Sequence, residues 1–228
     1  MAHVLPHGTV PGALVLTLAL LAASAADADV QYVYDDGQTD TAIGPPSSFP
    51  SDPQTGWGNY FVAQPGGETI TNVSVAFGPT WPTRGEVTVY LFEDPDDDFD
   101  PRNATLLTST TLTPPTIGMS AFNDFAITPT TVSGGFFVLA ATDTARGEDR
   151  PAAMDTSDAP TDRSWLVYNP IEDGVNVDDL SANAYIQPAA NATVFDGVFM
   201  IRATGVPEPT TATLAGLAGT LLLARRRR

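Results

Sequence analysis

The segment EVTVYLF, residues 86–92, decides the fold class of this chain. Its apolar residues Val87, Val89 and Leu91 fall on every second position, with Thr and Tyr between them. A period of two places these apolar side chains on one face of a β-strand and leaves the other face partly polar. The segment therefore predicts a strand with at least one face buried in a protein core.

Two other segments are apolar at nearly every position instead of every second one. They are GFFVLAAT, residues 135–142, and GVFMIRAT, residues 197–204. A strand of this composition needs cover on both faces. We expect both segments at the centre of the fold.

Six more short segments, bounded by Gly, Pro, Asp or Asn, have the composition of strands. They are YVY (32–34), NYFVA (59–63), ETITNVSVAFG (68–78), ATLLTSTTL (104–112), AFNDFAI (121–127) and RSWLVY (163–168). No long helical pattern competes with them, and no sequence repeat of fixed period is present. The sequence therefore predicts an all-β protein, an antiparallel β-sandwich of the jelly-roll or Ig-like kind. The Pro-rich stretch 44–56 and the stretch 143–163 are predicted to be long loops.

Composition excludes several classes of function. The 228 residues contain 27 acidic and 10 basic residues, giving a net charge of −17, and there is no cysteine. All basic residues are arginine, and the two histidines are His3 and His7. The chain after these histidines has no thiolate nucleophile, no Ser-His triad, no Schiff-base lysine and no imidazole metal ligand. Its negative charge repels phosphate backbones, so we expect no nucleic-acid partner.

The first 26 residues have the pattern of a secretory signal peptide. An eleven-residue apolar run, ALVLTLALLAA, is followed by Ser24, Ala25 and Ala26. The run is too short to span a bilayer, and the small residues after it suit cleavage by signal peptidase. The alternative interpretation is a buried strand or helix at the start of the domain. With cleavage here, residues 27–205 form the predicted sandwich domain.

The last 23 residues, 206–228, have three parts in a fixed order. Pro207, Glu208 and Pro209 come first, followed by the apolar run TTATLAGLAGTLLLA and then Arg225, Arg226, Arg227 and Arg228. As a helix the apolar run is roughly 22 Å long, a marginal length for a transmembrane helix. The arginines favour the cytoplasmic side, which leaves the Pro-Glu-Pro motif outside with the exported domain.

In these residues the chain resembles the PEP-CTERM family of exported bacterial proteins. The resemblance implies that Pro207, Glu208 and Pro209 form a sorting motif read by an exosortase, a membrane-embedded processing enzyme. It also implies transient membrane attachment, followed by removal or exchange of the tail on the way to the cell surface or extracellular matrix. The alternative is an ordinary membrane anchor that is never processed. More loosely, the middle of the chain resembles β-sandwich modules of secreted bacterial proteins, through YDDG (34–37), PAAMD (151–155), RSW (163–165) and MIRA (200–203).

The densest charge in the chain lies in EDPDDDFD, residues 93–100, where six of eight residues are acidic. Asp94, Asp96, Asp98 and Asp100 alternate as oxygen ligands do around calcium. Phe99 stands where an EF-hand loop requires glycine, so the segment is not an EF-hand. Two interpretations stay open, an irregular calcium loop and a solvated hairpin loop. No other cofactor is expected.

The remaining candidates concern carbohydrates. Trp57, Tyr60 and Trp81 lie in or beside predicted loops and are candidates for stacking on sugar rings of an extracellular polysaccharide. The alternative is that each ring fills the core. Carboxylates offer the acid-base chemistry of a calcium-dependent glycan hydrolase, with candidates Asp35, Asp36, Asp124, Asp143 and Asp155. No spacing singles out a pair of them, and no catalytic residue is predicted.

The sequence thus predicts a non-enzymatic, exported protein of the cell surface or extracellular matrix with a structural or adhesive role. A polysaccharide-binding module is the alternative, and a glycan hydrolase is a more distant one.

Overall fold

The computed structural model describes residues 29–81, 85–116, 118–157, 160, 162–192 and 196–207. The predicted signal peptide, Glu208, Pro209, the apolar run of the tail and the four terminal arginines lie outside these residues. Among the residues described, no helix has both the length and the apolar composition needed to cross a bilayer.

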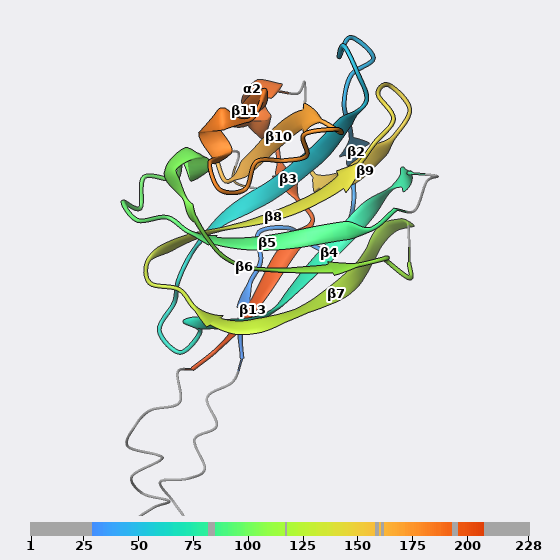
Figure 1. Ribbon diagram of the computed structural model, residues 1–228. Coiled ribbons are helices and arrows are strands. Elements are labelled where there is room, and N and C mark those ends of the chain that lie inside the picture. The colour runs from blue at the N-terminus through green and yellow to red at the C-terminus, as the bar shows by residue number, and fades with distance from the viewer. Residues whose placement is uncertain are drawn as a thin grey trace, which may run out of the picture. The chain divides into compact units, whose positions relative to one another are not determined.

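The described chain folds into two antiparallel β-sheets packed face to face, as the alternating sequence pattern predicts (Figure 1). The seven-stranded sheet contains β1 (Val30–Tyr32), β2 (Thr41–Ile43), β4 (Thr69–Thr80), β7 (Gly118–Thr131), β9 (Arg150–Asp155), β12 (Val198–Phe199) and β13 (Ile201–Val206). The six-stranded sheet contains β3 (Pro53–Val62), β5 (Val87–Glu93), β6 (Thr105–Leu112), β8 (Gly135–Asp143), β10 (Ser164–Pro170) and β11 (Tyr185–Pro188). The helical elements described are short: η1 (Pro101–Asn103), η2 (Leu180–Ala182) and α2 (Ala189–Ala192).

Strand order brings distant parts of the chain together. The six-stranded sheet runs β11-β10-β3-β8-β5-β6. The other sheet runs β1-β13-β4-β9-β12, with β2 added beside β9 and β7 beside β4. The first strand of the described domain therefore pairs with the last one, from Val30 opposite Gly205 to Tyr32 opposite Ala203.

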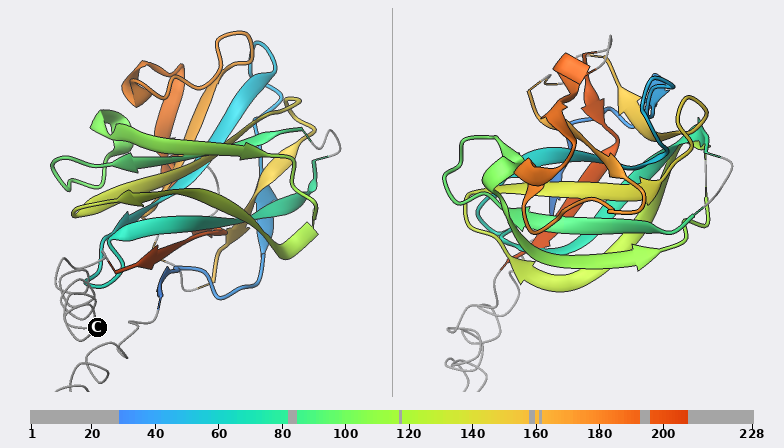
Figure 2. Two further views of the ribbon diagram at one scale, coloured as in Figure 1. Left: turned by 60° about the horizontal axis from the view of Figure 1, so that its bottom comes forward. Right: turned by 45° about the horizontal axis from the view of Figure 1, so that its top comes forward.

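The strand β8 confirms the expectation that GFFVLAAT is covered on both faces. Phe136, Val138 and Ala140 point into the main core between the sheets. Their neighbours, among them Phe137 and Leu139, point the other way into a second apolar cluster. The segment between β10 and β11 covers that cluster and contributes Val175 and Leu180 to it (Figure 2, right). Each large apolar side chain buried here stabilises the fold by about 1.5–3 kcal/mol.

The segment GVFMIRAT forms β12 and β13, and its apolar residues Val198 to Ile201 are fully buried. The chain shifts from one neighbour to another within it. Phe199 pairs with Met154 of β9, whereas Ile201 pairs with Val75 of β4.

The prediction of two long loops, over residues 44–56 and 143–163, is wrong in part. β3 begins at Pro53, inside the stretch expected to be irregular, and β9 occupies residues 150–155 of the second loop. The sequence RPAAMD has low strand propensity, because proline removes a backbone donor and alanine offers little side chain to pack. It is a strand because β2, β4 and β12 all pair with it.

Candidate functional site

The acidic loop, residues 94–100, follows β5 directly and ends at η1. Asp94 is 1% exposed, whereas Asp96 and Asp98 are exposed. One carboxylate oxygen from each of these three residues lies within 4.8 Å of the others. The structure thus brings together three of the four carboxylates that the sequence singled out.

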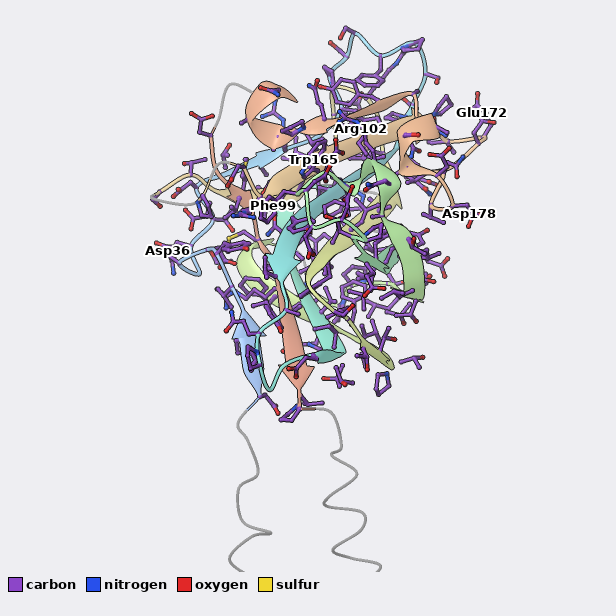
Figure 3. All side chains as sticks on the ribbon, turned by 90° about the vertical axis from the view of Figure 1, so that its left-hand side faces the viewer. Asp36, Phe99, Arg102, Trp165, Glu172 and Asp178 are labelled. Atoms are coloured by element: carbon purple, nitrogen blue, oxygen red, sulfur yellow. The ribbon has the colours of Figure 1, made fainter. Side chains whose placement is uncertain are left out.

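Asp100 does not join this cluster, which corrects the sequence prediction. Its carboxylate forms an ion pair with the Arg102 guanidinium at 2.7 Å and accepts the Arg102 backbone N–H at 3.0 Å. Asp100 is the N-cap of η1, a position where a side-chain acceptor satisfies a free backbone donor. The Arg102 guanidinium also lies 5.0 Å from the centre of the Trp165 ring (Figure 3).

The buried Asp94 carboxyl differs from the exposed carboxyls of Asp96 and Asp98 in its pKa and in its hydrogen bond. Loss of contact with water raises the pKa of its carboxyl, and the neighbouring charge of Asp96 raises it further. The Tyr60 hydroxyl donates a hydrogen bond to Asp94 Oδ2 at 2.5 Å. Burial, together with that carboxylate partner, raises the pKa of the Tyr60 hydroxyl far above its usual range. Tyr60 therefore stays protonated and acts as a donor.

The exposed part of the loop is held by several hydrogen bonds. Asn103 Nδ2 donates to Asp96 Oδ2 at 3.0 Å, and this bond lowers the pKa of the Asp96 carboxyl. The Asp97 carboxylate accepts the backbone N–H of Gly135 at the start of β8. Asp97 and Phe99 have φ values of 56° and 68°, in the left-handed region that non-glycine residues rarely adopt. These contacts fold the loop onto the sandwich. Asp96 and Asp98 are exposed, as a solvated hairpin loop predicts, whereas Asp94 is buried.

Carboxylate oxygens at this spacing are the ligands that calcium prefers, and a divalent cation would offset the repulsion among them. Partial protonation at Asp94 would offset it as well. The calcium ion at Asp94, Asp96 and Asp98 stays a prediction.

The three aromatic residues predicted to stack on sugars are buried, which corrects that expectation. Trp57, Tyr60 and Trp81 are each at most 1% exposed. The Trp81 ring stacks on Phe77 with centroids 5.3 Å apart, and the Trp57 and Phe77 rings form a T-shaped pair with centroids 6.0 Å apart. Both tryptophans fill the core between the sheets, and Tyr60 belongs to the outer cluster.

The carboxylates considered for glycan hydrolysis have structural partners. Asp35 pairs with Arg202, and Asp124 accepts from the Ser74 hydroxyl at 2.5 Å. Asp155 accepts the backbone N–H groups of Asp36 and Ser157, each at 2.8 Å. Asp143 is exposed and accepts from Gln54 Nε2 at 3.1 Å, and Asp36 accepts a backbone N–H within its own turn. Each of these five carboxylates therefore has a hydrogen-bond or ion-pair partner within the fold, and the glycan hydrolase stays a hypothesis.

A second site, not foreseen in the sequence, is a cavity of about 770 Å³ at one end of the sandwich. We call it the end cavity. Its walls come from β2 and the start of β9 in one sheet, and from β10 and β11 in the other. The Pro-rich segment 44–50 and the turn before β9 complete it, and these two connections project at the top of Figure 1 in blue and yellow.

Three aromatic rings and one buried carboxylate line the end cavity. The centroid of the Phe49 ring lies 5.0 Å from that of Tyr168 and 6.2 Å from that of Tyr185, and the two tyrosine rings are 5.4 Å apart. Asp149 is 1% exposed. Its Oδ2 accepts the Ala145 backbone N–H at 2.8 Å, whereas its Oδ1 is buried without a hydrogen-bond partner among the described residues.

The sequence held weak signals for this cavity. Phe49 stands alone in a Pro-rich stretch, and Tyr168 ends a segment already predicted to be a strand. Tyr185 and Asp149 lie in stretches where no strand was expected. Only the pairing of β10 with β11, which sets Tyr168 opposite Tyr185, brings these rings together.

Comparison with known proteins adds little to this geometry. No family model matches the chain, and no curated protein matches it. Among solved structures, the chain is similar to part of the cysteine protease and lectin-like domains of Cwp84, a surface layer associated protein of Clostridium difficile. The sequence identity is 14% and the TM-score 0.45, over 79% of this chain and 36% of that one.

Proposed function

We propose that this protein is exported, sorted through its C-terminal tail, and displayed at the cell surface or in the extracellular matrix as a structural or adhesive sandwich module. The observation that carries the proposal is the order of parts in the last 23 residues: Pro207-Glu208-Pro209, an apolar run and four arginines. An exosortase-type enzyme and signal peptidase are the proposed processing partners.

Two features of the chain support this role, one in the fold and one in the composition. The strands β1 and β13 pair with each other, so Val30 and Gly205, close to the two ends of the described domain, lie opposite each other in one sheet. Cleavage after residue 26 and within the tail would therefore leave all the described sandwich strands in place. The strong negative charge and the absence of cysteine suit a surface domain that is stabilised by its core alone.

Intact-mass measurement of the protein from its own host tests the proposal. We expect a species lacking the first 26 residues and the tail, recovered from the cell surface or the medium. The double variant Pro207→Ala with Pro209→Ala should accumulate with the tail attached. The matched control, Pro65→Ala with Pro115→Ala, changes two exposed prolines outside the motif and should be processed normally. Recovery of the wild-type chain ending in Arg228 would contradict processing.

A further inference from the structure

We propose that the end cavity binds a pyranose ring of a glycan, with Asp149 accepting a ligand hydroxyl and the partly exposed rings of Phe49 and Tyr185, backed by Tyr168, contacting the sugar face. The inference deepens the adhesive role proposed above and rests on it, because it names what the exported domain would adhere to. The end cavity takes the place of Trp57, Tyr60 and Trp81 as the candidate site for a sugar.

The buried carboxylate of Asp149 is the first argument for a ligand. A carboxylate accepts several hydrogen bonds, and a buried oxygen without one costs free energy. Oδ2 is used by the protein's own backbone at Ala145, but Oδ1 is buried without a partner among the described residues. Asp149 lines the cavity, so a small shift of its side chain would let a ligand O–H or N–H group reach this atom and satisfy it.

The aromatic rings are the second argument, because they select the shape of the ligand. Phe49 and Tyr185 are partly exposed and form an apolar surface with Tyr168, which is 3% exposed behind them, and the ring centroids lie 5.0–6.2 Å apart. Faces of pyranose rings carry C–H groups that pack on aromatic surfaces, while their edges carry hydroxyls. An apolar wall beside a few polar groups is the usual composition of a small-molecule site.

Charge at the rim favours a neutral sugar over a cation. Arg150 also lines the cavity, directly after Asp149 in the chain, and its side chain is exposed. A guanidinium donates to sugar hydroxyls but repels an ammonium group. The volume of about 770 Å³ lies within the roughly 300–1,000 Å³ range of small-molecule sites.

The walls of the cavity are held together by hydrogen bonds between the Pro-rich segment and the turn before β9. The Arg146 guanidinium donates to the carbonyl oxygen of Phe49, and the Gly147 backbone N–H donates to the carbonyl oxygen of Pro45 at 2.8 Å. Gly147 has φ of +75°, and a Cβ there would meet Ser47 Cβ at 2.8 Å. The Pro-rich segment is thus fixed against the turn, which lowers the entropy cost of ordering Phe49 for a ligand.

The test uses the full chain and a panel of soluble neutral oligosaccharides, namely cello-, xylo-, manno-, malto- and chitin-oligosaccharides. Isothermal titration calorimetry should show saturable binding to at least one of them. Asp149→Asn keeps the shape and the bond to Ala145 but replaces the free acceptor by a donor. We expect it to weaken binding about tenfold or more, the effect of losing a hydrogen bond to a charged group.

Two further variants make the result decisive. Asp173→Asn removes an exposed carboxylate on the turn after β10 and should bind as the wild type does. Phe49→Leu keeps an apolar residue but removes the ring, and should also weaken binding. Near-ultraviolet circular dichroism checks that each variant is folded.

Three outcomes would overturn the inference: no saturable binding across the panel, equal affinity of Asp149→Asn and wild type, or binding of tetramethylammonium in place of sugars. None of them affects the intact-mass test, so failure of glycan binding and failure of sorting can be told apart.

Discussion

The hydrogen bond from the Tyr60 hydroxyl to the buried Asp94 carboxyl ties the acidic loop to the sandwich. Tyr60 lies on β3 and Asp94 directly after β5, so the bond also crosses the intervening strand β8. Its value to the fold depends on the charge of Asp94, because a bond to an ionised group is stronger than one between neutral groups.

Removing this donor should destabilise the protein. We expect Tyr60→Phe to lower the free energy of unfolding by about 1.5–3 kcal/mol at pH 7, the range for hydrogen bonds to charged groups. Urea denaturation followed by circular dichroism measures it. Tyr90→Phe is the matched control, because Tyr90 is half-buried on β5, the strand that directly precedes Asp94. Equal losses in both variants would contradict a specific role for Tyr60.

The raised pKa of Asp94 gives a pH dependence of known sign. The fold favours the protonated form of the Asp94 carboxyl. Below the ordinary pKa of 3.8 this carboxyl therefore does not lower the free energy of unfolding, and it lowers it increasingly as pH rises through the raised pKa. With EDTA present, Asp94→Asn should therefore gain stability relative to wild type in the range from about pH 4 upward. Denaturation series at several pH values measure the difference. A difference that stays constant across this range would refute the assignment.

Calcium binding at Asp94, Asp96 and Asp98 predicts a rise in Tm of the full chain on adding calcium after EDTA treatment. A ligand at one hundred times its Kd stabilises a fold by about 2.7 kcal/mol. Asp98→Asn should reduce the rise, because Asp98 contributes one of the clustered oxygens, whereas Asp173→Asn should leave it unchanged. An identical Tm with calcium and with EDTA would exclude the metal.

At the scale of elements, β3 and β8 show how close packing depends on single residues. Gly58 on β3 pairs with Leu139 on β8. A Cβ at Gly58 would lie 2.5 Å from the Phe137 ring and closer still to the Val138 carbonyl oxygen. Backbone and buried ring both block it, so neither neighbour can move cheaply.

We therefore expect Gly58→Ala to destabilise the fold by about 1–3 kcal/mol, the usual cost of overpacking a core. Gly85→Ala is the control, because its added Cβ would make an ordinary contact of 3.6 Å with Thr142 Oγ1. Thermal unfolding of both variants gives the comparison. Equal stability of the two variants would show that β3 and β8 can separate without cost.

The strands β5 and β9 show when a strand can be predicted from its own sequence and when it cannot. In residues 86–92 apolar and polar residues alternate because buried and half-buried positions alternate along most of β5, and the strand forms as predicted. β9 has no such pattern. Its backbone is extended because neighbouring strands supply its hydrogen-bond partners, and that information lies elsewhere in the chain.

At the scale of the whole molecule, negative charge works against the compact state. The chain carries a net charge of −17, and folding brings these charges closer together than in the unfolded chain. The Debye length shortens from about 30 Å at 0.01 M salt to about 8 Å at 0.15 M.

We expect the Tm to rise as sodium chloride is raised from about 0.01 M to 0.15 M, because salt screens this repulsion. Differential scanning fluorimetry measures the rise. Choline chloride at the same ionic strength is the control, since it should act equally through screening. A falling Tm in both salts would show that attractive ion pairs, such as Arg202 with Asp35, outweigh the net repulsion.

By itself the sequence determined the all-β class, the burial of β8 on both faces and the excess of negative charge, because each follows from the periodicity of a continuous segment or from composition. Tertiary structure alone decided which carboxylates meet and which aromatic rings are available. Asp100 leaves its neighbours for Arg102, and Trp57 and Trp81 turn into the core. Phe49, Asp149, Tyr168 and Tyr185 meet in one cavity although more than one hundred residues separate the first from the last. Strand pairing and sheet packing set such distances, and no local pattern records them.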